Sequence, residues 1–275
     1  MTTPVIEQTL AGHVAVITGA NHGIGAATAV ALAARGAAVV LTYLRLGDTG
    51  DPASTATYRG NRGRDAAAVL ETITAAGGRG RAVEADLSDP AVPARLFDLA
   101  ERELGPVDVL VNNASGWLAD TFKADGTDRF GRALTPVTAA TFDHLFAVDA
   151  RGSALMIAEF ARRHLARQAS YGRIISLTSG DGGGFPEEVS YGAAKAALND
   201  YTLSAALELA DAGIAANVLH PPVTDTGWVT DEVRAFVAAS RDLVHVAAPE
   251  QVAEVIAYLA GEQSGLITGN IIRLR

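Results

Sequence analysis

The sequence predicts an α/β protein built on a doubly wound sheet of about seven parallel strands, with helices on both faces. Short runs rich in β-branched residues alternate with alanine-rich stretches along the whole chain, the pattern of a parallel sheet covered on both faces. The 275 residues are 49% hydrophobic, which is enough to fill a buried core. No linker interrupts the alternation, so we expect a single domain over residues 1–275.

The individual elements follow from this alternation in chain order. The expected strands span residues 13–18, 37–43, 81–85, 107–112, 172–178, 213–219 and 270–274. The expected helices span residues 24–35, 64–76, 90–103, 139–167, 190–211 and 249–260. Asp89 before Pro90 indicates the N-cap and first position of the third helix, and Gly261 indicates the end of the last one.

Two segments look inserted, residues 46–64 and 116–136. Each follows the expected carboxyl end of a parallel strand, the edge at which open α/β sheets bind ligands. The second carries Trp117 and Phe122, and Trp228 lies further along the chain. These aromatic side chains either wall a site for an apolar or ring-shaped substrate or pack their own loops.

Composition excludes several classes of function. A formal net charge of −9 gives no general attraction to nucleic acid or to an anionic membrane. The chain has no cysteine, which excludes disulfides, thiolate zinc sites and thiol catalysis, and its six scattered histidines suggest no metal site. Neither a basic segment followed by an apolar run at the start nor an apolar span of about 18 residues occurs. We therefore expect a soluble, cytoplasmic protein.

A glycine-rich turn, Thr18-Gly19-Ala20-Asn21-His22-Gly23-Ile24-Gly25, follows the first expected strand and opens a helix. Glycine permits the tight turn and lets a pyrophosphate approach the helix N-terminus, where free N–H groups and the helix dipole favour anions. The position of this turn between a strand and a helix is the context that dinucleotide binding requires.

Tyr191 and Lys195 form a second informative pattern. The chain has 22 lysines and arginines, but only Lys123 and Lys195 are lysines, so an ammonium group in particular is indicated at 195. Residues four apart share a helix face, and a nearby cation lowers the pKa of a phenol from about 10. The pair is therefore expected to transfer protons, unless it is an exposed aromatic beside a solvated lysine.

With these motifs in view, the chain resembles the short-chain dehydrogenase/reductase family in its single-domain, Rossmann-type form, over nearly its whole length. The glycine turn matches the family's cofactor loop, and Tyr191 and Lys195 match its catalytic pair. Three further elements match in order: Asp86 in Glu84-Ala85-Asp86-Leu87, Asn112-Asn113-Ala114-Ser115 with serine for the family's glycine, and Pro221-Pro222-Val223-Thr224-Asp225-Thr226.

The resemblance implies a nicotinamide cofactor and a set of residues that bind it. This set comprises Gly19, Asn21, His22, Gly23, Ile24, Gly25, Arg45, Asp86, Leu87, Asn113, Ala114, Ser115, Tyr191, Lys195, Pro221, Thr224 and Thr226. Enzymes that prefer NAD place a carboxylate at the end of the second strand, whereas a 2′-phosphate calls for a basic group there. Tyr43 holds that position, with Arg45 and His22 nearby, so NADP(H) is favoured. Asp48 is close enough to compete, and NAD(H) stays as the alternative.

The resemblance also implies the catalytic residues Ser179, Tyr191, Lys195 and Asp149. Aligning from the strand start selects Ser179 as the hydroxyl that binds the substrate oxygen, whereas counting thirteen residues back from Tyr191 selects Thr178; we expect Ser179. Asp149 stands where the family has an asparagine that helps to hold a water beside the lysine. It either pairs directly with Lys195 or is a benign replacement.

The expected function is hydride transfer between NADPH and a small-molecule carbonyl or alcohol, with Tyr191 as general acid and base. The alternatives are a 3-oxoacyl-thioester (acyl-carrier-protein) reductase, a reductase of imine or pterin-like C=N bonds, and a non-catalytic NADP-binding regulator. The family resemblance also implies a homodimer or homotetramer. The chain ends at residues 271–275 without the family's usual tail, which leaves the geometry of a tetramer open.

Overall fold

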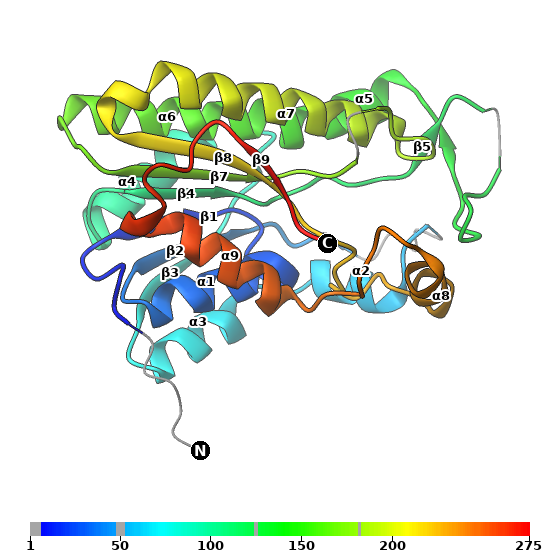
Figure 1. The fold of residues 1–275 in the computed structure, drawn as a ribbon, viewed down its shortest axis with the longest axis horizontal. Helices are drawn as coiled ribbons and strands as arrows, with labels where there is room; N and C mark the ends of the chain where they lie inside the picture. The colour runs from blue at the N-terminus through cyan, green and yellow to red at the C-terminus, as the bar shows by residue number, and fades with distance from the viewer. Residues whose placement is uncertain (1–6, 48–52, 124–125, 181–182) are drawn as a thin grey trace.

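A seven-stranded sheet forms the centre of the computed structural model, which describes residues 7–47, 53–123, 126–180 and 183–275 (Figure 1). The strands are β1 (Val14–Ile17), β2 (Ala38–Tyr43), β3 (Arg79–Glu84), β4 (Val109–Asn112), β7 (Gly172–Leu177), β8 (Ile214–His220) and β9 (Ile271–Arg273). They pair in parallel in the order β3-β2-β1-β4-β7-β8-β9. The strand order reverses between β1 and β4, which creates the crevice where such sheets bind ligands. The predicted fold class is confirmed.

Helices cover both faces of this sheet, as Figure 1 shows. One face is covered by α1 (Gly23–Ala34), α3 (Ala67–Ala75) and α9 (Pro249–Ala260), and the other by α4 (Val92–Glu103), α6 (Ser153–Ala166) and α7 (Val189–Glu208). Successive side chains of a strand point to opposite faces, so β1 sends Ala15 and Ile17 to the first layer and Val14 and Val16 to the second. Two apolar layers therefore hold the sheet between them.

The helix predicted over 139–167 is present, but a π-helical turn divides it. The chain forms α5 (Ala139–Leu145), a π-helical turn over Phe146–Gly152, and then α6. A π-turn widens the helix by one residue and often marks a functional site. The start predicted for α4 is also displaced. Ala91 is its N-cap, and Asp89 instead accepts a hydrogen bond from the Ala91 amide and pairs with Arg95.

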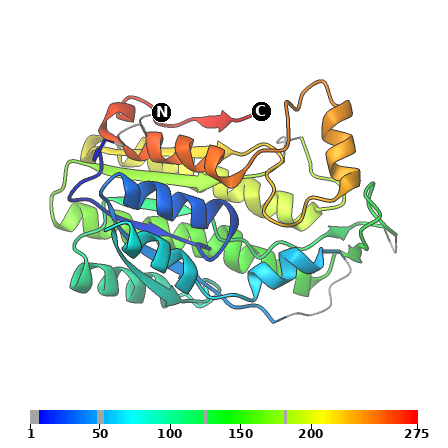
Figure 2. The ribbon, with the colours of Figure 1, turned by 90° about the horizontal axis from the view of Figure 1, so that it is seen from below.

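Both inserted segments and one unpredicted helix gather at the same end of the molecule. The described part of 46–64 contains α2 (Ala56–Arg62), and 116–136 contains β5 (Asp120–Thr121) paired with β6 (Thr135–Pro136). A further helix, α8 (Asp231–Ala239), is capped by Thr230. Figures 1 and 2 both show these elements at the right-hand end. In the part of the chain that the structure describes, no helix has the length and apolarity needed to cross a membrane.

Candidate active site

A cavity of about 350 Å³ lies beyond the carboxyl ends of β1 to β4. Of the residues predicted to bind the cofactor, the structure brings together Gly19, Asn21, His22, Gly23, Ile24, Asp86, Leu87, Asn113, Ala114, Ser115 and Thr226 in its wall. Gly25, Arg45, Tyr191, Lys195, Pro221 and Thr224 are not among the lining residues. Sequence reasoning missed Tyr58, Arg62 and His144, which do line the cavity. The position of the inserted segment 46–64 at this edge of the sheet indicates that it borders a ligand site. No sequence pattern identifies Tyr58 and Arg62 as the side chains that do so.

The glycine turn is built to carry an anion. Gly19 and Gly23 have φ angles of +66° and +57°, where side chains are strained, and a Cβ on Gly25 would collide with the carbonyl oxygen of Gly19. Asn113 holds the turn by donating from Nδ2 to the carbonyl oxygens of Thr18 and Gly19, both at 2.9 Å. The open N-terminus of α1 therefore faces the cavity in a fixed cradle, and a dinucleotide pyrophosphate fits it.

Arg45, the predicted partner of a 2′-phosphate, is engaged elsewhere. Its guanidinium binds both carboxylate oxygens of Glu84, with Nη2 to Oε2 at 2.6 Å and Nε to Oε1 at 3.1 Å. Both residues line a neighbouring cavity rather than the one above. Tyr43 ends β2, as expected, and lines the cavity beside the glycine turn. Asp48, the competing carboxylate, lies outside the described residues.

His22 is a neutral member of the turn. Its ring meets Tyr58 edge-on, with ring centroids 5.7 Å apart, and its Nδ1 is buried with no hydrogen-bond partner among the described residues. Burial, followed by the charge of Arg62, lowers the pKa of His22 from 6.5 to about 4. At neutral pH the imidazole therefore supplies no positive charge to a phosphate.

This buried imidazole predicts acid sensitivity. The pKa of His22 is about 4 in the folded protein and near 6.5 in the unfolded chain. Between these two pH values the unfolded chain therefore binds a proton at this residue more readily than the folded protein does. The free energy of unfolding should therefore fall as the pH decreases through this window, by up to about 3 kcal/mol from this group. Urea unfolding at pH 7 and pH 4.5 measures this decrease in the free energy of unfolding. The decrease should be smaller in the His22→Asn variant. Substitution of the exposed His245 by Asn is the control, and equal pH dependence in both variants would refute the assignment.

Lys195 is held by a carboxylate. Its Nζ lies 3.0 Å from Asp149 Oδ1 and donates to the carbonyl oxygen of Leu177 at 3.0 Å. Both side chains are buried, with 3% of Lys195 and none of Asp149 exposed, so the pair is hardly screened by water. Asp149 lies in the π-helical turn, and its Oδ2 accepts from the Gly116 amide at 2.8 Å. Of the two alternatives for Asp149, the structure therefore shows direct pairing with Lys195.

Tyr191 lies one turn before Lys195 on α7, with Ser179 hydrogen-bonded to it. Thr178, the rival of Ser179, is buried and its Oγ1 has no hydrogen-bond partner in the described chain. The expectation of a lowered pKa for Tyr191 is wrong in its net direction. Burial, and then the charges of Asp149 and Glu188, raise the pKa of Tyr191 well above 10, and the bond from Ser179 offsets only part of this.

Aromatic side chains from three segments meet beside these groups. The Trp117 ring lies 6.1 Å from that of Tyr58, and the Arg132 guanidinium lies 5.4 Å from the Trp117 ring and 5.9 Å from that of Trp228. Arg132 also pairs with Asp128 and with Glu188. Phe122, the other candidate for this wall, is 83% exposed and does not contribute.

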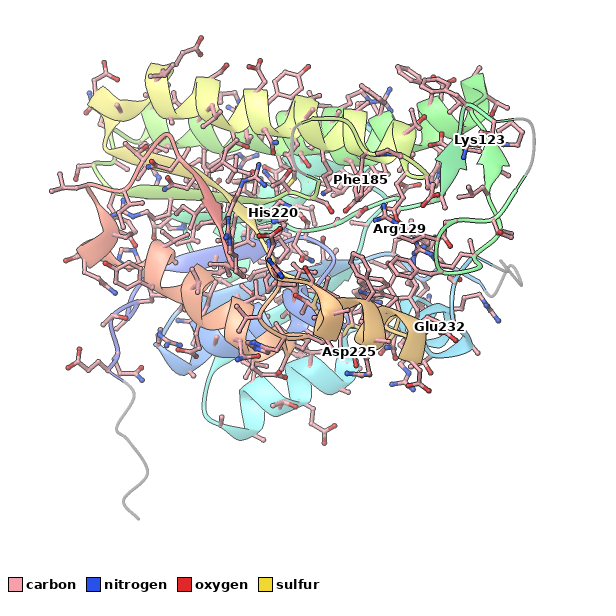
Figure 3. The ribbon with its side chains drawn as sticks, turned by 45° about the vertical axis from the view of Figure 1, so that its right-hand side comes forward. Lys123, Arg129, Phe185, His220, Asp225 and Glu232 are labelled. Atoms are coloured by element: carbon pink, nitrogen blue, oxygen red, sulfur yellow. The ribbon has the colours of Figure 1, made fainter. Side chains whose placement is uncertain are left out.

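The segment after β8 closes the remaining side. Trp228 Nε1 donates to the Thr224 carbonyl at 2.9 Å, and Asp225 pairs with Arg234 of α8 at 2.5 Å. Figure 3 shows Asp225 beside α8. Arg129 of the 116–136 segment contacts the same helix, with its guanidinium 5.8 Å from the centroid of the Phe236 ring. Among the described residues, no group of three potential ligands is placed to hold a metal ion.

The chain is similar to known proteins over nearly its whole length. A family model described as short chain dehydrogenase matches residues 13–235. Cis-4-hydroxycyclohexanecarboxylate dehydrogenase of Sinomonas cyclohexanicum is 36% identical over 269 residues, covering 96% of each chain. Two solved structures are similar throughout. A 3-oxoacyl (acyl-carrier-protein) reductase from Agrobacterium tumefaciens with NADP bound has a TM-score of 0.79, 28% identity and coverage of 97% of this chain and 94% of that one. A blue fluorescent protein from a metagenomic library in complex with NADPH has a TM-score of 0.77, 31% identity and 97% coverage of both.

Proposed function

The chain belongs to the short-chain dehydrogenase family, and on this premise we propose that it transfers a hydride between NADP(H) and a carbonyl or alcohol, with Tyr191 as general acid and base. The sequence resemblance is thereby confirmed, and the chain is an oxidoreductase of this family. The observation that carries the finer proposal is the grouping of Tyr191 with Ser179 and the buried Lys195–Asp149 pair, at the same sheet edge as the glycine cradle.

The chain's own residues would hold the cofactor along this edge. The glycine turn and the α1 N-terminus receive the pyrophosphate, Asp86 and Leu87 lie where the adenosine is expected, and Asn113 to Ser115 and Thr226 border the path toward Tyr191. Gly25, Pro221 and Thr224 do not line the cavity. Gly25 instead shapes the glycine turn, and Pro221 and Thr224 shape the segment after β8. When bound, the nicotinamide supplies or accepts the hydride.

Tyr191 holds the proton that a reduced carbonyl oxygen requires. Burial raises its pKa, so the phenol keeps this proton at neutral pH, the form in which it can donate to the carbonyl oxygen. Ser179 donates to the same oxygen and orients it. Lys195, fixed by Asp149 and the Leu177 carbonyl, orients the ribose and the phenol.

Two observations support NADP(H) over NAD(H). The last residue of β2 is Tyr43 rather than an acid, and two of the similar solved structures contain NADP or NADPH. The Arg45–Glu84 pair weakens the contribution expected from Arg45, so NAD(H) is kept as the alternative.

The aromatic wall supports a ring-shaped substrate. Trp117 and Trp228 present flat apolar surface on Arg132, and Tyr58 lies edge-on to Trp117. The relative from Sinomonas cyclohexanicum is named for a hydroxylated cyclohexane acid. We therefore propose a cyclic ketone or its alcohol as the substrate class. The homodimer or homotetramer, the cytoplasmic location and the single-domain assignment stay predictions.

NADPH consumption with a panel of carbonyl compounds tests the proposal. We expect turnover with cyclic ketones, and a kcat/KM at least about tenfold higher with NADPH than with NADH, because a charge-assisted phosphate contact contributes about 1.5–3 kcal/mol. Equal values for the two cofactors would overturn the NADP(H) assignment.

The same panel separates the alternatives. Preference for 3-oxoacyl thioesters would favour the activity named for the similar Agrobacterium tumefaciens structure, and turnover of imines alone would favour C=N reduction. Binding of NADPH without turnover of any compound would favour a regulator.

A further inference from the structure

The inserted helix α2 is attached to both segments that frame the cofactor cavity. From the glycine turn, Asn21 Nδ2 donates to the carbonyl oxygens of Asn61 at 3.3 Å and Arg64 at 2.9 Å. Toward the segment after β8, Asn61 Nδ2 donates to the Thr226 carbonyl at 3.2 Å. These bonds place α2 across the space between the turn and Thr226, where it forms a wall of the cavity.

Two side chains of this helix, Tyr58 and Arg62, line that wall one helical turn apart. The Arg62 guanidinium lies 5.5 Å from the centroid of the Tyr58 ring, and the His22 ring meets Tyr58 edge-on with centroids 5.7 Å apart. These contacts hold Arg62 along the cavity beside the glycine turn. Its charge also helps to lower the pKa of His22, after burial, so its field acts on that turn.

Arg62 carries a positive charge that no carboxylate in the described chain balances with an ion pair. It differs in this from Arg45, whose charge is balanced by Glu84. Arg62 is also the only lysine or arginine among the described residues that line the cavity, and His22 is neutral there. A partly buried cation facing a cavity gains most from an anionic ligand, because charge-assisted hydrogen bonds are the stronger kind.

We propose that Arg62 binds a phosphate group of the dinucleotide, so that the inserted helix supplies the cation that the glycine turn itself lacks. The inference rests on the proposed function, since it requires a nicotinamide dinucleotide in the cavity. A phosphate here has two sources, the pyrophosphate shared by both cofactors and the 2′-phosphate present only in NADPH. In either case Arg62 determines affinity for the cofactor.

Binding of NADPH and NADH to Arg62→Gln, followed by nicotinamide fluorescence without substrate, tests this role. Loss of one charge-assisted contact should weaken binding by about 10- to 100-fold. An equal loss of affinity for both cofactors would show that Arg62 binds the pyrophosphate. A loss of affinity for NADPH alone would show that it binds the 2′-phosphate. Arg62→Met keeps an alkyl chain against Tyr58, so it should show the same loss if charge is the cause.

Arg79→Gln is the matched control. It removes the same charge from an exposed residue at the amino end of β3, on the opposite edge of the sheet, and should leave both affinities within twofold. Unchanged binding by both Arg62 variants, while the unmodified protein binds NADPH, would overturn the inference alone. Absence of binding by the unmodified protein would instead overturn the proposed function.

Discussion

Substitution of Tyr191 by Phe is expected to lower kcat/KM for ketone reduction by about 10²- to 10⁴-fold, the usual contribution of a positioned general acid. Phenylalanine keeps the ring near Phe185, with the ring centroids 6.0 Å apart, but removes the hydroxyl that bonds to Ser179 and that we propose as the proton donor. Affinity for NADPH, measured by fluorescence, should change less than about threefold, because Tyr191 is not among the residues that line the cofactor cavity.

Tyr201, an exposed tyrosine further along α7, provides the control. Tyr201→Phe makes the same chemical change on the same helix and should leave kcat/KM unaltered. If Tyr191→Phe kept more than a tenth of the activity, another group would have to donate the proton, and the assignment of Tyr191 would fail.

Substitution of Asp149 by Asn should have two large and separable effects. The first is on stability: breaking a buried pair leaves Lys195 charged without its partner, which typically costs about 3–5 kcal/mol. The second is on the pH profile. Asp149 is one of the charges that raise the pKa of Tyr191, so its loss lowers that pKa. Alcohol oxidation requires the phenolate, and its rate should therefore begin to rise at lower pH than in the unmodified enzyme.

Urea unfolding and the pH dependence of alcohol oxidation measure these effects. Asp143→Asn, a change at an exposed carboxylate of α5, is the control for both. The double variant Asp149→Asn with Lys195→Met should be more stable than Asp149→Asn alone, because no buried charge is then left unpaired. An unchanged midpoint of the pH profile would show that Asp149 does not govern the tyrosine.

The sheet and the glycine turn could be predicted because their signals are local. Alternation of β-branched and alanine-rich runs places the strands, and the turn requires glycine where φ is positive, at Gly19 and Gly23. The partners of Arg45 could not be predicted. Glu84 reaches it because β2 and β3 pair with Tyr43 opposite Glu84, a register that joins residues some forty positions apart.

The environment of the candidate site was harder to predict for the same reason. The motif placed Tyr191 and Lys195 on one helix face, and Asp149 was recognised as a candidate partner of the lysine. The direction of the tyrosine pKa depends on burial and on carboxylates brought in by distant segments, so a rule for an isolated pair gave the wrong sign. The role of α2 depends on tertiary hydrogen bonds from Asn21 and Asn61 that no sequence pattern records.

Arg132 has a consequence for how substrate preference can change during evolution. One guanidinium touches Trp117 and Trp228 and pairs with Asp128 and Glu188, so it joins the 116–136 segment, the start of α7 and the segment after β8. Residues that share a partner do not contribute independently. We therefore expect substitutions in these three segments to be epistatic, so that a new specificity would require compensated sets of changes rather than single steps.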